Sequence, residues 1–376
     1  MGADFPPRRA QVVPIPGREH GVVGRGASTN IGNRFERLGS APDEEWNHAE
    51  DPGPQTVFFE DATSSLLTSN DSPDIGFDVS FNPYRGCEHG CIYCYARPTH
   101  EYLGWSAGLD FESRILVKSQ APLLLRRELS APGWKPQLIM ASGVTDCYQP
   151  VERRLRLTRS CLEVLSEFRN PVSIITKSAL VIRDIDVLSD LARHQAASVT
   201  LSVTTLRQDL SLALEPRAAV PAARLQAIAA LAAAGIPVGV NLCPIIPGLT
   251  DHEIPAILKA CAAAGARWAG YGLVRLPHAV APLFEQWLGE KQPGVKDKVL
   301  ARIREVRDGR LNDARFGTRR TGEGIYARQI ASLMEVQCRR HGLDGGFPEL
   351  STTSFLSPSG RQLSWLSDAT EVPRRA

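Results

Sequence analysis

The sequence lacks a hydrophobic run long enough to cross a membrane. Its most apolar stretch, residues 227–240, is interrupted by Gly235 and Pro237 and is too short to span a bilayer. The first nine residues, MGADFPPRR, contain no apolar segment of the kind found in signal peptides. These absences predict a soluble cytoplasmic protein with no membrane partner.

The sequence also has little net charge and few cysteines. The 376 residues carry a formal net charge of only +2, so any surface that binds nucleic acid must be local. The eight cysteines are too few and too clustered for the disulfide framework of a secreted protein. Since a group of free thiols needs a reducing compartment, the cysteines also favour the cytosol. A hydrophobic content of 43% is enough for a sizeable core in one large domain or two smaller ones.

Three cysteines form the most informative motif. Cys87, Cys91 and Cys94 have the spacing CxxxCxxC. Three thiolates can ligate three irons of a [4Fe–4S] cluster, which leaves the fourth iron open to a substrate or cofactor. The alternative is a zinc site completed by His89 or His100. Structural zinc sites usually pair two separated half-sites, and the second half is missing here, so the iron–sulfur interpretation is favoured.

From residue 77 onward the chain alternates between strand-like and helix-like segments. Strands are expected at residues 77–81, 137–141, 172–176, 198–204, 236–243 and 268–274, after an earlier strand at 56–61. Helices are expected at residues 120–129, 153–168, 180–192, 221–234 and 254–264. This alternation predicts an α/β fold with parallel strands, a six-unit (βα) partial barrel. Catalytic groups of such barrels lie at the carboxyl ends of the strands, and the cysteine motif directly follows the first one.

We expect three regions in the chain. Residues 1–55 have few apolar positions and are expected to form a flexible N-terminal tail, although Gly24–Phe35 could instead dock onto the domain or a ligand. Residues 56–290 contain the predicted barrel. Residues 291–376 are expected to form a basic helical extension.

Arginine dominates this C-terminal extension. Residues 296–340 contain 12 Lys or Arg against six Asp or Glu. Arg302, Arg307, Arg319 and Arg320 are therefore candidate contacts to the phosphates of a nucleic acid. The alternative is a solvated helix face with ion pairs along the helix, such as Glu305 with Arg302.

The cysteine motif, with Tyr93 directly before its last cysteine, resembles that of the radical S-adenosylmethionine (SAM) superfamily. The resemblance implies a radical SAM partial barrel in which Cys87, Cys91 and Cys94 hold a [4Fe–4S] cluster and SAM binds the open iron. It further implies reductive cleavage of SAM to a 5′-deoxyadenosyl radical, which abstracts a hydrogen atom from a substrate. An external electron donor of flavodoxin or ferredoxin type would supply the electron, and Tyr93 would lie near the adenine.

Three further segments resemble the spore photoproduct lyase branch of this superfamily: ITKS at 175–178, the LEP…R…RLxAIxxLxxAGIPVGV run, and CPIIPG at 243–248. The lyase of that branch splits a thymine dimer in DNA. An uncharacterised bacterial family of the branch is more similar still. The hydrogen-donor cysteine of the lyase falls on Gly143 here, so Cys147 is a candidate donor only by its proximity. The alternative for Cys147 is an inert buried thiol.

Polar residues at the ends of the expected strands are candidates for the SAM pocket. Ser142 allows close approach of a ligand to the backbone, Lys177 can pair with the SAM carboxylate, and Ser202 can contact the ribose. Asn241 is polar within an apolar strand and needs a partner, for which adenosine is suitable. Asp146 is a candidate catalytic or ligand-binding carboxylate. The alternatives are a helix cap for Asp146 and a solvated surface position for Lys177.

We therefore expect a radical SAM enzyme that abstracts hydrogen from its substrate, with a DNA lesion as one candidate. Radical modification of a protein, a nucleotide or another small molecule is the first alternative. A non-catalytic metal-cluster protein that binds nucleic acid through its C-terminal arginines is the second.

Overall fold

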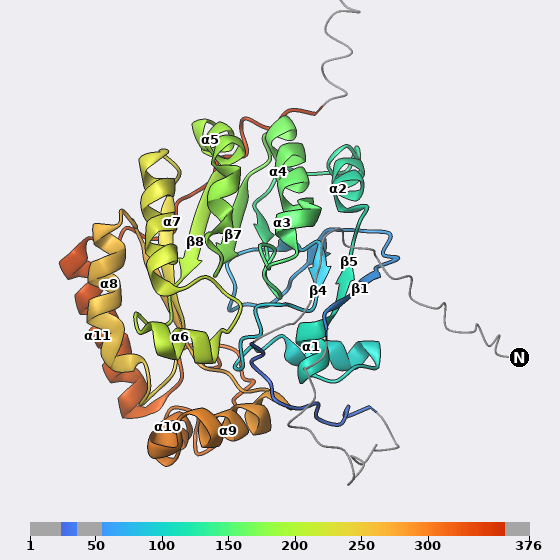
Figure 1. The fold of residues 1–376 in the computed structure, drawn as a ribbon. Helices are drawn as coiled ribbons and strands as arrows, with labels where there is room; N and C mark the ends of the chain where they lie inside the picture. Colours follow the sequence, from blue (N-terminus) through green and yellow to red (C-terminus); the bar gives the residue numbers. More distant parts are fainter. Residues whose placement is uncertain (1–23, 36–54, 358–376) are drawn as a thin grey trace, which may run out of the picture.

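The computed structural model describes residues 24–35 and 55–357. Its centre is a seven-stranded sheet with the order β10-β9-β8-β7-β6-β3-β2 (Figure 1). The strands are β2 (Thr68–Ser69), β3 (Val79–Phe81), β6 (Ile139–Ala141), β7 (Val172–Thr176), β8 (Ala197–Ser202), β9 (Val238–Ile245) and β10 (Ala269–Leu273). All neighbours from β3 to β10 are parallel, and β2 adds an antiparallel edge. The six predicted strands are confirmed in sequential order, as a partial barrel requires.

Helices connect the strands and cover the outside of the sheet. They include α2 (Ala121–Leu129), α4 (Leu157–Phe168), α5 (Ile185–Arg193), α6 (Gln208–Leu214), α7 (Pro221–Ala233) and α8 (Ile254–Ala263). Figure 1 shows α7, α5, α4 and α2 outside the strands. All six residues of β8 are buried, because the barrel interior covers one face and helices cover the other. The carboxyl ends of six parallel strands therefore meet at one end of a rigid core.

Two predicted helices are interrupted. The expected helix at 153–168 is split into α3 (Glu152–Leu155) and α4, because Arg156 has a left-handed backbone with φ of 53°. The expected helix at 180–192 starts with a 3₁₀ segment, Ala179–Asp184, before α5 begins. A further 3₁₀ segment, Asp251–Glu253, precedes α8.

A small second sheet lies beside the cysteine motif. It has the order β1-β5-β4, with β1 (Val57–Glu60), β4 (Tyr84–Arg85) and β5 (Arg114–Val117). The strand expected at 56–61 is confirmed as β1, whereas β5 was not predicted. Between the motif and β5 lie a 3₁₀ segment, Arg97–Leu103, and α1 (Leu109–Ser113).

The segment 24–35 docks onto the domain. The backbone N–H groups of Gly26 and Ala27 donate hydrogen bonds of 3.0 and 2.8 Å to the carboxylate of Glu112. Glu112 is itself buried and paired with Arg97. For this segment the expectation of a flexible tail was wrong and the docking alternative is right. The rest of the expected tail up to residue 54 lies outside the described residues.

Helix α9 (Val280–Lys291) precedes the predicted C-terminal extension. Between residues 291 and 357 the extension contains a 3₁₀ turn at Pro293–Val295, α10 (Lys296–Glu305) and α11 (Gly324–His341). Figure 1 shows α11 beside α8, and α9 with α10 at the end to which the arrowheads of β7 and β8 point. Apolar residues of α9 and α10 share a core with Ile92 and Tyr93 of the cysteine motif. No described helix is long and apolar enough to cross a membrane.

Candidate functional site

A cavity of about 260 Å³ opens at the carboxyl ends of the barrel strands. Nine of the ten residues predicted for the site line it. These nine are Cys87, Cys91, Cys94, Tyr93, Ser142, Asp146, Lys177, Ser202 and Asn241. The tenth, Cys147, is fully buried outside the lining. The fold thus brings together residues that are spread over about 150 positions of sequence, as the carboxyl-end rule for parallel barrels requires.

The three cysteines of the motif reach the cavity from one tight loop. The Cys87 N–H donates to the carbonyl of Phe111 at 3.0 Å, and the Arg97 guanidinium donates to the carbonyl of Cys91 at 3.0 Å. All three thiols are free, and burial raises their pKa values. Three thiolates on a single cavity wall are the donor set of a [4Fe–4S] cluster with one open iron.

Both histidines of the zinc alternative have other partners. The Nδ1 of His89 lies 3.4 Å from a carboxylate oxygen of Asp146, and the Nε2 of His100 is 2.8 Å from the carbonyl of Arg114. Burial also lowers the pKa of His100 to about 4. Within the described residues, no three His, Cys, Asp or Glu side chains are grouped to hold a single metal ion. The zinc alternative therefore has no support from this geometry.

Tyr93 is fixed by a buried ion pair. Its hydroxyl donates to Glu215, which also accepts a bond of 2.8 Å from Thr204 and pairs with Arg224. Both Glu215 and Arg224 are 1% exposed. Burial alone would raise the pKa of Glu215, but Arg224 and Lys177 lower it, so the carboxylate is ionised. The sequence contains this pair in its LEP…R run, yet only the structure shows that the pair orients Tyr93.

Asp146 joins the loops that follow β6 and β7. Its carboxylate accepts bonds from the Tyr148 N–H at 2.9 Å, the Thr176 hydroxyl at 2.8 Å and the Lys177 N–H at 2.8 Å. Burial alone would raise the pKa of Asp146, but His89 and these bonds lower it to about 2. Asp146 is therefore an acceptor at neutral pH. The helix-cap alternative was wrong, because the Tyr148 N–H belongs to a turn and not to a helix.

Lys177 is half-buried in the cavity wall, so the solvated alternative was wrong. Its ammonium donates to the carbonyl of Cys243 at 3.3 Å and lies 5.8 Å from the centre of the Tyr93 ring. Burial opposes its charge, but Glu215 and the neighbouring thiols raise its pKa above the usual range. A cation in this position can pair with a bound carboxylate.

Ser142 and Cys147 contact each other behind the cavity wall. The Ser142 hydroxyl accepts from the Cys147 N–H at 3.2 Å and lies 3.2 Å from its Sγ. Ser142 has a φ of 91°, a left-handed conformation that costs free energy in any residue but glycine. Burial raises the pKa of Cys147, and Thr158 donates to its carbonyl at 2.6 Å. The inert alternative describes this thiol better than the donor role.

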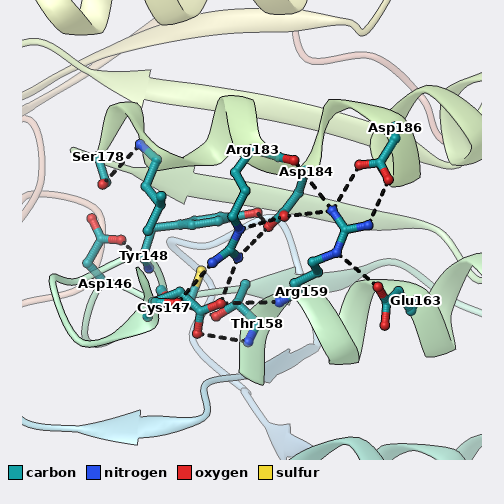
Figure 2. A network of polar contacts seen from close by, with 12 residues as sticks. Asp146, Cys147, Tyr148, Thr158, Arg159, Glu163, Ser178, Arg183, Asp184 and Asp186 are labelled. Atoms are coloured by element: carbon teal, nitrogen blue, oxygen red, sulfur yellow. Dashed lines mark hydrogen bonds and ion pairs between the residues drawn. The ribbon is translucent and has the colours of Figure 1, made fainter. Parts of the chain in front are cut away.

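A buried polar network stabilises the loop that carries Asp146 and Cys147 (Figure 2). The Tyr148 hydroxyl donates to Asp184 at 3.0 Å, and Figure 2 shows Arg159 and Arg183 directed at the same carboxylate. Arg183 also pairs with Glu152 at 2.8 Å. Because these charges are mutually satisfied, the network fixes the loop that carries Asp146 without placing a titratable group in the cavity.

Ser202 is the last residue of β8 and pairs with Asn241 in the middle of the neighbouring strand β9. Ser202 is 3% exposed, and its carbonyl accepts from Arg224 at 2.9 Å. The Asn241 side-chain amide faces the cavity and forms no hydrogen bond to any described residue. It is therefore available to a ligand.

The four predicted basic residues of the extension do not share one environment. Arg307 is 1% exposed and donates to the backbone carbonyls of Leu273 and Val274 at 3.2 and 2.8 Å, so its assignment as a nucleic-acid contact was wrong. Arg302 pairs with Glu305 at 2.6 Å, the ion pair expected in the alternative interpretation. Arg319 and Arg320 line the cavity itself.

The cavity lining also includes residues that the sequence did not predict for the site. Among them are Tyr95, Cys243 and Arg275. Tyr95 directly follows the cysteine motif and donates to the carbonyl of Gly143 at 2.5 Å. Arg275 follows the sixth predicted strand, a position that could have identified it.

Comparisons with known proteins identify the family of the chain. Residues 81–261 match the family model described as the radical SAM superfamily. The uncharacterized protein Rv2578c of Mycobacterium tuberculosis is 34% identical over 245 residues, which cover 65% of this chain and 71% of that protein. The uncharacterized protein MJ0683 of Methanocaldococcus jannaschii is 33% identical over 178 residues, 47% of this chain and 64% of that one.

Solved structures show the same fold. Spore photoproduct lyase in complex with a dinucleoside spore photoproduct aligns with a TM-score of 0.53 and 14% identity, over 76% of this chain and 78% of that one. A variant of that lyase with bound AdoMet and the same dinucleoside has a TM-score of 0.53 and 15% identity, over 74% and 77% of the two chains. Because residues 81–261 match its family model, the chain belongs to the radical SAM superfamily, whose members use a [4Fe–4S] cluster and SAM as cofactors.

Proposed function

We propose that this protein cleaves SAM reductively and abstracts a hydrogen atom from a substrate bound in the same cavity. The observation that carries the proposal is the shared lining: three thiols and polar side chains from the strand ends face one space. When bound, the cluster and SAM supply one-electron reduction of a sulfonium and hydrogen-atom abstraction. The protein supplies binding, orientation and exclusion of water.

Each polar side chain then has a specific part in holding SAM. Cys87, Cys91 and Cys94 hold three irons, and Lys177 pairs with the SAM carboxylate. Tyr93, oriented by Glu215, presents its ring to the adenine. The amide of Asn241, which has no hydrogen-bond partner among the residues that the structure describes, binds the adenosine. Ser202 contacts the ribose, and Ser142 allows close approach at the end of β6. Asp146 holds the loops of the site in place as an ionised acceptor.

The chemistry needs an electron from outside the chain, so a flavodoxin or ferredoxin type of donor is the expected partner. Free thiols that hold a cluster also require a reducing compartment, which favours the cytoplasm. Among substrates we place a nucleic acid first, because Arg319 and Arg320 bring positive charge to the cavity wall. A protein or a small molecule is the alternative.

The test is an anaerobic assay of the reconstituted full-length protein. The protein is loaded with iron and sulfide, reduced with dithionite and given SAM, and the 5′-deoxyadenosine that forms is measured. We expect product from the wild type and none from the triple variant Cys87→Ala/Cys91→Ala/Cys94→Ala. Cys261→Ala, which removes a buried thiol outside the cavity, is the matched control and should retain product formation. A colourless wild type that carries zinc and forms no deoxyadenosine would refute the proposal.

A further inference from the structure

Three arginines gather on a part of the cavity wall that the proposed SAM contacts do not use. Arg275 follows β10, and Arg319 and Arg320 lie in the segment between α10 and α11. The two stretches are joined where the Leu273 N–H donates to the carbonyl of Arg320 at 2.8 Å. The buried Arg307 bridges them a second time, because it donates to the carbonyls of Val274 and Arg319 at 2.8 and 2.7 Å. The arginines are thus held in place by a rigid backbone.

Among the described residues, only one carboxylate forms an ion pair with any of these three arginines. Arg319 forms an ion pair with Asp74. Arg320 donates to the main-chain carbonyl of Asp74 at 2.6 Å, which is a neutral acceptor, and its side chain is exposed. Arg275 forms no ion pair with any described residue, and its buried Nε has no hydrogen-bond partner among them. Within the part of the chain that the structure describes, the charges of Arg275 and Arg320 therefore have no carboxylate counterion.

The half-buried position of Arg275 is unfavourable for its positive charge. Burial and the neighbouring Arg319 both lower its pKa. The ring of Tyr95, 5.3 Å from its guanidinium carbon, offsets part of this cost by a cation–π contact. A buried polar atom without a partner normally costs free energy, and such atoms are rare unless a ligand or water satisfies them. The cavity side is where such a ligand can approach.

We propose that Arg275 and Arg320 bind a phosphate group of the substrate. Two uncompensated charges match the charge of about −1.5 to −2 that a phosphate monoester carries at neutral pH. Planar guanidinium groups also suit phosphate oxygens, to which they donate parallel hydrogen bonds. The inference rests on the proposed function in taking this cavity as the substrate site. The phosphate can belong to a free nucleotide or to a nucleic acid, and the experiment separates the two sources.

The test is calorimetric titration of the full-length protein at low salt, without SAM or reductant. The ligands are inorganic phosphate, a nucleoside 5′-monophosphate and a single-stranded oligonucleotide without terminal phosphates. We expect phosphate to bind the wild type and Arg275→Gln to weaken binding by roughly tenfold or more, the effect of losing a hydrogen bond to a charged group. Arg320→Gln should also weaken the binding of phosphate. Arg126→Gln, which changes an exposed arginine of α2, should leave binding within about twofold.

The outcomes separate this inference from the proposed function. No phosphate binding by the wild type, or unchanged binding by both Arg275→Gln and Arg320→Gln, would overturn the phosphate site whether or not SAM is cleaved. Phosphate binding without deoxyadenosine formation would overturn the proposed reaction and leave the site standing. If Arg275→Gln fails to fold, the exposed Arg320 still provides the test. Tighter binding of the monophosphate than of the oligonucleotide identifies a free nucleotide as the source, and the reverse identifies a nucleic acid.

Discussion

Tyr93 of the cysteine motif donates a hydrogen bond to Glu215, which lies 122 positions further along the chain. Glu215 is also the counterion of Arg224, whose guanidinium bonds the carbonyl of Ser202 at 2.9 Å. One buried ion pair thereby connects the cysteine loop with the end of β8. Two predicted contacts of SAM, Tyr93 and Ser202, thus depend on the same carboxylate.

Replacing this carboxylate should destabilise the protein strongly. Glu215→Gln leaves Arg224 as a buried charge without a counterion, a change that costs about 3–5 kcal/mol in the free energy of unfolding. Urea unfolding of the wild type and the variant measures the difference. The matched control is Glu167→Gln, which removes an exposed partner of Arg126 and should cost no more than about 1 kcal/mol. Equal losses in the two variants would show that the buried pair has no special role.

Lys177 provides a separate test of the SAM pocket. Lys177→Met keeps an unbranched side chain of nearly the same length but removes its charge, so we expect SAM to bind the reconstituted protein about tenfold more weakly or worse. Equilibrium dialysis with labelled SAM measures this change. Lys259→Met, on the exposed side of α8, is the control and should bind like the wild type. Unaltered affinity in Lys177→Met would remove this residue from the pocket.

The pH dependence of SAM binding follows from the same side chain. Burial opposes the charge of Lys177, but Glu215 and nearby thiols raise its pKa above the ordinary 10.5. The ammonium therefore remains charged up to and beyond that pH. We expect no loss of SAM affinity attributable to Lys177 between pH 7 and about pH 9. A fall in wild-type affinity over this range that Lys177→Met lacks would contradict the raised pKa.

The six strands could be predicted because they are short runs rich in apolar and β-branched residues. The more continuous apolar runs, such as residues 172–176, are typical of parallel strands buried on both faces. Their order then placed Ser142, Lys177 and Asn241 at one end of the barrel without any knowledge of contacts. The buried Arg307 could not be distinguished from Arg302 in the same way. Both lie in one basic segment, and only the backbone carbonyls of Leu273 and Val274, distant in sequence, show that Arg307 is structural.

The docking of segment 24–35 could not be predicted from the sequence pattern either. The segment has few apolar residues, and composition alone therefore favours a mobile tail. Its attachment relies on backbone N–H groups that donate to Glu112, a polar contact over more than 80 positions. Such a contact leaves no periodic signal in the sequence.

Asp146 should make stability depend on pH in the acid range. Its pKa is about 2 in the folded protein against an ordinary 3.8. At pH values well above 3.8, the ionised carboxylate therefore stabilises the fold by about 2 kcal/mol. This stabilisation is lost as the pH falls from about 4.5 towards 2. Unfolding measured from pH 6 to pH 3 should therefore show a steeper decline in the wild type than in Asp146→Asn. Parallel declines would contradict the lowered pKa.

The contact between Gly26 and the cysteine loop can be tested with two glycines of the same segment. A Cβ on Gly26 would lie 1.6 Å from the carbonyl oxygen of Gly90, whereas a Cβ on Gly32 would meet nothing within 4 Å. Gly26→Ala must therefore displace the segment from the loop between Cys87 and Cys91, and Gly32→Ala need not. We expect hydrogen exchange at the Gly26 and Ala27 amides to rise about tenfold or more in Gly26→Ala, since both lose their bonds to Glu112. The reconstituted variant should also lose its iron–sulfur absorbance faster in air, because the segment shields that loop. Exchange and decay rates equal to those of Gly32→Ala would show that the segment neither packs on the loop nor protects it.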